Sequence, residues 1–275
     1  MNTELSFEVF PPKTSDGIEK IYACLDGLSK LNPSFISVTY SAGNAKKGLT
    51  AEVCEYIQNK YGIPAVSHLT CAGATFESVK RELGILKSKK VNTILALRGD
   101  ITPDKKLGEY RHATDLIKVI NDFGGFETCG ACYPEGHVES GSVYDDLFTI
   151  KAKYDLGVRK FISQLFLDNA DFLHMRDEGK KACEDGLFCA GIMPVLSAGS
   201  VYRMLTLSGA KLTKEMREIL GKFGGEPASM KKAGIEYAVK QIRNLCAEGC
   251  DGIHIYTMCK ADVADKICDG IKDAL

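Results

Sequence analysis

Residues 35–70 read FISVTYSAGNAKKGLTAEVCEYIQNKYGIPAVSHLT, and this segment decides the fold class. It begins with the apolar run Phe35–Tyr40 and ends with a second such run, Pro64–Thr70. Between them lies a stretch in which apolar residues recur with helical spacing. A strand, a helix and a strand in this order predict a βαβ unit, which connects two strands of a parallel sheet.

The stretch between the two runs is expected to be a helix over Thr50–Tyr61. Its side chains at Val53, Tyr56 and Ile57 return to one helix face at spacings of three and four residues. A threonine hydroxyl can accept a hydrogen bond from a free backbone N–H of the first turn, so Thr50 is the expected N-terminal cap.

The same alternation continues on both sides of this unit and gives eight strand-like runs. The runs are Leu5–Phe10, Phe35–Tyr40, Pro64–Thr70, Asn92–Leu97, Thr128–Tyr133, Phe161–Phe166, Phe188–Val195 and Gly252–Met258. Eight βα units fit the 275 residues of the chain, since a (β/α)8 barrel typically needs about 250. We therefore expect an α/β fold, a single (β/α)8 TIM-barrel domain over residues 1–275.

An open, doubly wound sheet is the alternative, because alternation alone does not distinguish an open sheet from a closed barrel. No G-x-G-x-x-G motif follows the first run, which argues against a dinucleotide-binding Rossmann unit. The segment 212–230 contains Gly221, Gly224 and Gly225 and is expected to be a loop inserted before the last helix.

The composition excludes several classes of protein. Apolar residues make up 45% of the chain and charged residues 26%, which is typical of a globular domain with a large core. The formal net charge of −1 gives no broad positive field for nucleic acid or an anionic membrane, so a small-molecule partner is expected. Without an apolar run of about 20 residues or a signal-peptide pattern, the sequence predicts a cytoplasmic protein.

Eleven cysteines are scattered through strand-like and helix-like stretches, and we expect most of them to be reduced thiols. Cys129 and Cys132 form a lone C-x-x-C motif. Within a strand, a spacing of three places the two side chains on opposite faces, which favours ordinary thiols over a redox pair. No H-E-x-x-H motif or second C-x-x-C is present, so no metal site is predicted.

Polar residues follow the strand-like runs at the carboxyl ends of the strands, where a closed α/β barrel builds its active site. The most informative is Glu8, a carboxyl group flanked by Phe7, Val9 and Phe10. Burial favours the protonated form of a carboxyl group, which is the form that a general acid needs. A structural carboxylate in a salt bridge is the alternative for Glu8.

The segment 97–100, LRGD, places Arg98 and Asp100 on either side of a glycine directly after the fourth run. Glycine permits close approach of the backbone, and the two charged side chains would flank the opening of the barrel. This arrangement suits an anionic or heterocyclic ligand, whereas the alternative is a solvated turn with a local ion pair. His68 and His137, taken singly, are more often structural than functional.

Eight motifs together resemble those of the methylenetetrahydrofolate reductases, in the same order and at matching spacing. They are SFEVFPP at 6–12, SVTY at 37–40, HLTC at 68–71, ALRGD at 96–100, YPEGH at 133–137, QLFLD at 164–168, GIMPV at 191–195 and HIYT at 254–257. The resemblance implies a (β/α)8 barrel that holds FAD at its carboxyl face. It also implies reduction of the methylene group of 5,10-methylenetetrahydrofolate to a methyl group.

The resemblance supplies roles for three residues. Glu8 falls on the family's catalytic acid, which helps to open the five-membered ring of the folate to an iminium that receives hydride from the flavin. Asp100 falls on an aspartate beside flavin and pterin, where a negative charge would stabilise the iminium. Gln164 falls on a side chain that contacts folate and nicotinamide in turn.

Further residues are implied by the same resemblance. Those expected to line the flavin, together with Asp100, are Thr39, Tyr40, Ala42, His68, Arg98, Gly99, His112, Tyr133, His137, Asp146 and Lys153. Lys153 and Arg98 suit the phosphates and polar edges of the cofactor. Ser200 and Lys260 fall at positions that bind substrate.

The residue at position 204 bears on the identity of the reductant. An aromatic residue that covers the reactive face of the flavin in the family aligns with Met204, and methionine makes less directional contacts than a ring. We therefore expect slow reduction by free NADH or NADPH, with electrons arriving from a partner protein. The electron donor is NAD(P)H or that partner protein, and the chain is expected to form a homo-oligomer or a hetero-complex.

Two other functions are consistent with a barrel of this kind. One is a flavin-free, pterin-binding methyltransferase, which would bind folate but would be colourless. The other is a non-catalytic barrel subunit of an electron-transfer complex. The presence of Glu8, Asp100 and Gln164 argues against the second.

Overall fold

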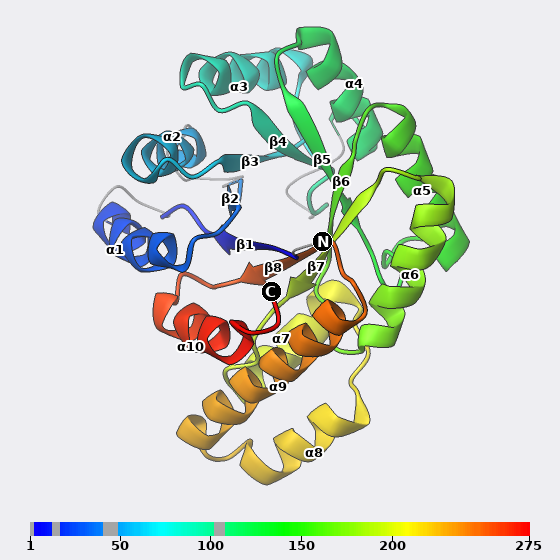
Figure 1. The fold of residues 1–275 in the computed structure, drawn as a ribbon. Coiled ribbons are helices and arrows are strands. Elements are labelled where there is room, and N and C mark those ends of the chain that lie inside the picture. Colours follow the sequence, from blue (N-terminus) through cyan, green and yellow to red (C-terminus); the bar gives the residue numbers. More distant parts are fainter. Residues whose placement is uncertain (1–2, 13–16, 41–48, 102–107) are drawn as a thin grey trace.

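The computed structural model describes residues 3–12, 17–40, 49–101 and 108–275, and its eight parallel strands form one closed barrel in the order β1 to β8. The helices surround the strands (Figure 1). The strands are β1 Glu4–Val9, β2 Phe35–Val38, β3 Ala65–Thr70, β4 Thr93–Leu97, β5 Glu127–Cys132, β6 Lys160–Ser163, β7 Leu187–Ile192 and β8 Gly252–Tyr256. The helices are α1 Ile18–Leu28, the short 3-10 helix η2 Ser29–Leu31, α2 Leu49–Tyr61, α3 Phe76–Ser88, α4 Ala113–Phe123, α5 Val143–Asp155, α6 Asn169–Ala182, α7 Ala198–Ser208, α8 Lys214–Phe223, α9 Pro227–Ala247 and α10 Ala261–Ile271.

The predicted (β/α)8 barrel is confirmed, and each of the eight strand-like runs overlaps one strand. The barrel closes through the pairing of β8 with β1, which runs from Glu4 opposite Gly252 to Glu8 opposite Tyr256. The open, doubly wound alternative is therefore wrong for this chain. Because all strands are parallel, their carboxyl ends meet at one rim, where residues distant in sequence come together.

The segment 35–70 folds as β2, α2 and β3. Helix α2 buries Val53 and Ile57 and packs on both strands, as their spacing predicts. The cap expected at Thr50 is wrong, because the helix has already begun at the preceding residue. The Thr50 hydroxyl instead donates to the backbone oxygen of Thr39 at 3.0 Å, which ties the start of α2 to the end of β2.

Alternation of side chains along the strands divides the core into two parts. The set inside the barrel is Phe35, Val66, Leu95, Cys129, Ile162 and Cys189. A larger set, which includes Cys132, fills the space between the sheet and the helices. Cys129 and Cys132 therefore point to opposite faces of β5, as their spacing predicts. None of the eleven cysteines, all of which lie in the described ranges, forms a disulfide bond.

The loop predicted over residues 212–230 is wrong, since this segment contains α8 and the start of α9. Met216, Ile219 and Phe223 recur along one face of α8 and pack with Val195 in a second apolar cluster. This packing outweighs the glycine within the helix, because one exposed glycine costs a helix only about 1 kcal/mol relative to alanine.

Gly221→Ala in α8 is expected to raise the free energy of unfolding by about 0.5–1 kcal/mol, because alanine loses less backbone freedom in a helix. The added methyl group would meet no atom within 4 Å. Gly270→Ala in α10 is the contrasting control, since its methyl group would lie 2.7 Å from the Val239 side chain and should destabilise. Urea unfolding of both variants measures the difference, and a destabilised Gly221→Ala protein would contradict the prediction.

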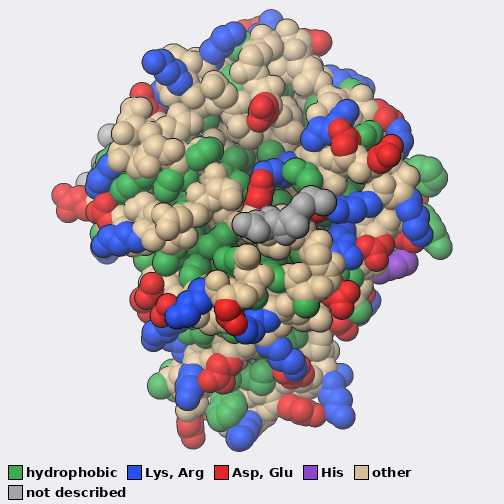
Figure 2. Space-filling model, viewed as in Figure 1, with side chains coloured by type: hydrophobic (Ala, Val, Ile, Leu, Met, Phe, Trp, Pro, Cys, Tyr) green, Lys and Arg blue, Asp and Glu red, His purple; other side chains and the backbone are tan. Residues whose placement is uncertain are grey.

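Among the described residues, no helix is long and apolar enough to span a bilayer. Acidic and basic side chains are interspersed over the face shown in Figure 2, with no extended region of one sign. This surface agrees with the formal net charge of −1.

Candidate functional site

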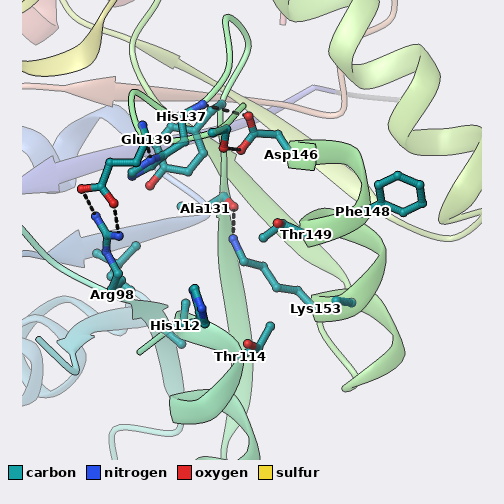
Figure 3. A pocket seen from close by; sticks show the side chains of 16 residues that line it. Arg98, His112, Thr114, Ala131, His137, Glu139, Asp146, Phe148, Thr149 and Lys153 are labelled. Carbon is teal, nitrogen blue, oxygen red and sulfur yellow. Dashed lines mark hydrogen bonds and ion pairs between the residues drawn. The ribbon is translucent and has the colours of Figure 1, made fainter. Parts of the chain in front are cut away.

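Two adjoining cavities lie at the carboxyl ends of the strands. The large cavity, of about 490 Å³, lies between the ends of β4 and β5, the start of α4 and helix α5 (Figure 3). The small cavity, of about 250 Å³, is lined by residues at or just after the ends of β1 to β6 and by Tyr256 of β8. Arg98, Tyr133 and His137 line both cavities, so one ligand can extend from one into the other.

Glu8 lines the small cavity and is only 6% exposed, which confirms its predicted burial. Its Oε2 atom lies 3.4 Å from Nε2 of His68 and 3.8 Å from Nε2 of His254. The His68 Nε2 atom is buried without a hydrogen-bond partner among the described residues. Burial lowers the pKa of His68, although the Glu8 charge opposes this effect, so the ring is neutral and gives Glu8 no strong ion pair. These observations argue against the structural salt bridge considered for Glu8.

Arg98 projects from the end of β4 and forms a bidentate ion pair with Glu139, at 2.5 and 2.9 Å (Figure 3). This pair joins the segments that follow β4 and β5 at the boundary of the two cavities. It raises the pKa of Arg98 and lowers that of Glu139. The ion pair within the LRGD turn, considered as an alternative, is wrong, because the partner of Arg98 comes from another loop. Asp100, the other charged residue of the turn, lines the small cavity.

Lys153 and Asp146 lie on the inner side of α5 and are both buried. Lys153 Nζ donates to the backbone oxygen of Ala131 at 2.6 Å (Figure 3). Asp146 accepts from the backbone N–H of His137 at 2.9 Å and from the Ser140 hydroxyl at 3.2 Å. Burial lowers the pKa of Lys153 to about 8, with the charges of Cys132 and Asp146 acting in the opposite direction. The large cavity therefore holds a desolvated amine that a bound anion would keep charged.

Tyr133 and His137 lie where the two cavities adjoin and line both of them. Their rings meet edge to face, with centroids 4.8 Å apart and an interplanar angle of 87°. Burial raises the pKa of Tyr133 to about 12, which keeps its hydroxyl protonated and able to donate a hydrogen bond.

The structure brings most of the predicted site residues together. The small cavity contains Glu8, Thr39, His68, Arg98, Gly99, Asp100, Tyr133, His137 and Gln164. The large cavity contains Arg98, His112, Tyr133, His137, Asp146 and Lys153. The catalytic and flavin-lining residues expected from the sequence thus converge on one continuous region, with the exceptions that follow.

Four predicted residues are exceptions. Three of them line neither cavity, and the fourth lies outside the residues that the structure describes. Tyr40 is half-buried and packs on the main core. Ser200 lies in the first turn of α7, where its hydroxyl donates to the Ser197 backbone oxygen at 2.6 Å. Lys260 is exposed at the start of α10. Ala42 lies outside the described residues.

The expected position of Met204 over a flavin is wrong. Its side chain is 3% exposed and packs with Val195, Val201 and Met216 in the cluster beneath α7. It lines neither cavity. Tyr202, two residues earlier, is 65% exposed, because residues two apart on a helix point about 160° away from one another. The side chain of Met204 therefore gives no argument about nicotinamide stacking.

Sequence reasoning missed two residues of this region. Glu139 lies 41 positions from Arg98 in the sequence, and nothing in its local pattern distinguishes it from a solvated loop residue. The position of His254 could have been predicted from the sequence, because it is two residues before Tyr256 on β8 and its side chain therefore shares the inward face of that strand.

Comparison with known proteins gives a consistent result. A family model described as methylenetetrahydrofolate reductase matches residues 1–272. The 5,10-methylenetetrahydrofolate reductase of Pectobacterium carotovorum subsp. carotovorum is 31% identical over 264 residues, 96% of this chain and 88% of the relative. That of Escherichia coli K12 is 30% identical over 264 residues, 96% of this chain and 89% of the relative.

One solved structure shares the fold over almost the whole chain. It is an uncharacterized protein from Clostridium thermocellum that binds two copies of 5-methyl-5,6,7,8-tetrahydrofolic acid. The TM-score is 0.70 at 15% sequence identity, and the match covers 98% of this chain and 94% of that one. At this identity the likeness shows the architecture alone.

Proposed function

The chain belongs to the methylenetetrahydrofolate reductase family, and from this premise we propose that it reduces 5,10-methylenetetrahydrofolate to 5-methyltetrahydrofolate with FAD. The observation that carries the proposal is the pair of adjoining cavities, which share Arg98 and hold a buried carboxyl group, Glu8, in the smaller one. When bound and reduced by NAD(P)H, this cofactor would supply the hydride that the methylene carbon receives.

The residues present fit such a cofactor. Small-molecule sites typically enclose about 300–1,000 Å³, and the large cavity alone has about 490 Å³. Its buried Lys153 and the guanidinium of Arg98 are suited to an anionic group. Tyr133 and His137 offer an aromatic wall where the two cavities meet. We propose that these four residues hold the cofactor across the boundary between the cavities.

The remaining chemistry is assigned to the small cavity. We propose that Glu8 donates a proton to the folate as its five-membered ring opens, which general acid catalysis requires of a positioned acid. Asp100 lies in the same cavity and would stabilise the positive charge of the resulting iminium. Gln164 lines this cavity too, and its Oε1 accepts from the Leu165 backbone N–H at 2.9 Å, so the side-chain amide group is fixed for contact with substrate.

We propose NAD(P)H as the reductant. The preference for a partner protein came from Met204, and that side chain packs in the core away from both cavities. Stopped-flow mixing with each nucleotide under anaerobic conditions tests this proposal. Flavin that is reduced only by a protein donor would restore the earlier expectation.

Purified protein is expected to be yellow, with about one FAD per chain, because the residues suited to the cofactor come from one barrel. Absorbance spectra before and after release of the flavin measure the stoichiometry. Addition of NADH and then methylenetetrahydrofolate under anaerobic conditions should bleach and then restore the flavin band. A colourless protein that binds folate but takes up no FAD would instead favour a flavin-free methyltransferase.

A further inference from the structure

His254 is a fully buried imidazole in β8 to which the proposed reaction gives no part. Its ring stacks on Phe35 with centroids 5.6 Å apart. Its Nδ1 atom lies 2.8 Å from the Ser6 hydroxyl. Its Nε2 atom lies 3.3 Å from the Ser37 hydroxyl and 3.8 Å from Oε2 of Glu8. The ring therefore stands between a hydroxyl of β1 and the carboxyl group proposed as the acid.

The Ser6 hydroxyl determines which ring nitrogen carries the proton. A serine hydroxyl has one hydrogen, and that of Ser6 is directed at the backbone oxygen of Ile253, at 3.2 Å. A carbonyl oxygen only accepts, so the Ser6 oxygen is left to accept from Nδ1 of His254. In the neutral ring the hydrogen then lies on Nδ1, and Nε2 is the acceptor, which takes a hydrogen bond from the Ser37 hydroxyl at 3.3 Å and also faces Glu8 at 3.8 Å.

Other groups near the Glu8 carboxyl group do not supply a hydrogen bond to its charged form. His68 is neutral and makes no hydrogen bond with Glu8. The Tyr256 hydroxyl donates to the Ser163 backbone oxygen at 2.6 Å and is not available to Glu8. The thiol of Cys259, whose pKa is lowered mainly by a hydrogen bond with Cys24, is directed at the Phe10 backbone oxygen at 3.7 Å.

The charged groups of the small cavity complete these surroundings. Asp100 is a second acidic group there, and Arg98 is paired with Glu139. Within the described part of the chain, no hydrogen bond to the Glu8 carboxyl oxygens is formed. The Glu8 carboxyl group is thus buried without a hydrogen-bond donor from the described residues.

We propose that His254 is a positioning residue for Glu8: Ser6 holds its ring with the hydrogen on Nδ1, so that Nε2 faces Glu8 as an acceptor and favours the acid form of the carboxyl group. This proposal rests on the assignment of Glu8 as the proton donor. A small rotation about the last side-chain torsion of Glu8, which is a soft torsion, would bring the acid hydrogen to Nε2. His254 thus keeps the proton on the carboxyl group until substrate takes it.

The first test is a measurement on the unaltered protein. Nitrogen-15 NMR of the five histidine rings distinguishes the two neutral forms of imidazole, and loss of one signal in His254→Asn assigns it. We expect His254 to carry its hydrogen on Nδ1. A hydrogen on Nε2 would overturn the proposal, whether or not any variant folds.

The second test compares two variants by infrared spectroscopy. The carbonyl band of the protonated Glu8 is obtained by subtracting the spectrum of Glu8→Gln. His254→Asn retains a polar group for Ser6 but lacks the acceptor at Nε2, and it should lower the ratio of acid to carboxylate at Glu8 by roughly 5- to 10-fold. As the pH is raised, this variant should lose folate reduction at a lower pH than the wild type does. His174→Asn, on the exposed face of α6, is the matched control. It should change neither the ratio of acid to carboxylate at Glu8 nor the pH dependence of folate reduction.

The outcomes separate this proposal from the function on which it rests. A lowered acid band in His254→Asn, in a protein that reduces no folate, would support the role of His254 and contradict only the function. An unchanged band and pH profile, in a protein that needs Glu8 for folate reduction, would overturn the role of His254 alone. If His254→Asn does not fold, Ser6→Ala gives the same comparison, because it removes the acceptor of the Nδ1 hydrogen.

Discussion

Glu8→Gln is expected to reduce the rate of folate reduction by about 10²–10⁴-fold, the usual contribution of a general acid. Glutamine has nearly the same shape as glutamate but has no proton to donate at this position. The strand should remain in place, since its end is fixed by the Thr257 hydroxyl, which donates to the backbone oxygen of Glu8 at 2.7 Å. Flavin content and reduction of the flavin by NADH should therefore stay close to the wild type.

Glu4→Gln is the matched control for this variant. Glu4 lies on the same strand and the same inward face, four residues before Glu8, and pairs with Lys160 at 2.6 Å at the opposite end of the barrel. Its amide variant should reduce folate at nearly the wild-type rate. Single-turnover experiments with prereduced enzyme measure the folate step alone. A Glu8→Gln protein with near-normal turnover would remove Glu8 from the mechanism.

The barrel was predictable because its signal is repeated. Each strand-like run coincides with one strand to within about three residues, and eight repeats of a βα unit leave few other architectures. Helix α8 was not predictable from the same rules, because Gly221, Gly224 and Gly225 lower its local propensity. Its stability comes from the packing of Met216 and Phe223 with residues of α7 and α9, which local sequence does not reveal.

The site was predictable where strands position it. Glu8, His68 and Gln164 follow from the alternation of side chains and from the common rim of parallel strands. Which side chains of a helix face a cavity is harder to predict, because a shift of one residue in an alignment turns a side chain by about 100°. This explains why Met204 was expected in the cavity and lies in the core. The pairing of Arg98 with Glu139 depends on how two loops meet, and neither loop sequence specifies that geometry.

Lys153→Met is expected to have opposite effects on stability and on cofactor binding. Burial lowers the pKa of Lys153 from 10.5 to about 8, so the unfolded chain binds this proton more tightly than the folded one. Burying this amine therefore lowers the free energy of unfolding by about 3 kcal/mol. This destabilisation is fully present below pH 8 and disappears as the pH rises toward 10.5. Methionine removes this destabilisation but loses the hydrogen bond to Ala131. The apoprotein should gain about 1–2 kcal/mol at pH 7.

The same variant should bind FAD roughly 10- to 100-fold more weakly, because a charge-assisted hydrogen bond to an anionic group is lost. Flavin fluorescence titration of the apoprotein measures the affinity, and urea unfolding from pH 7 to pH 10 measures the stability. Wild-type stability, relative to the variant, should increase between pH 8 and pH 10. Lys151→Met is the control, since Lys151 lies on the exposed side of the same helix, paired with Asp155, and should affect neither property strongly. A Lys153→Met protein that binds FAD as tightly as the wild type would show that the buried amine is structural and that the cofactor's anionic group lies elsewhere.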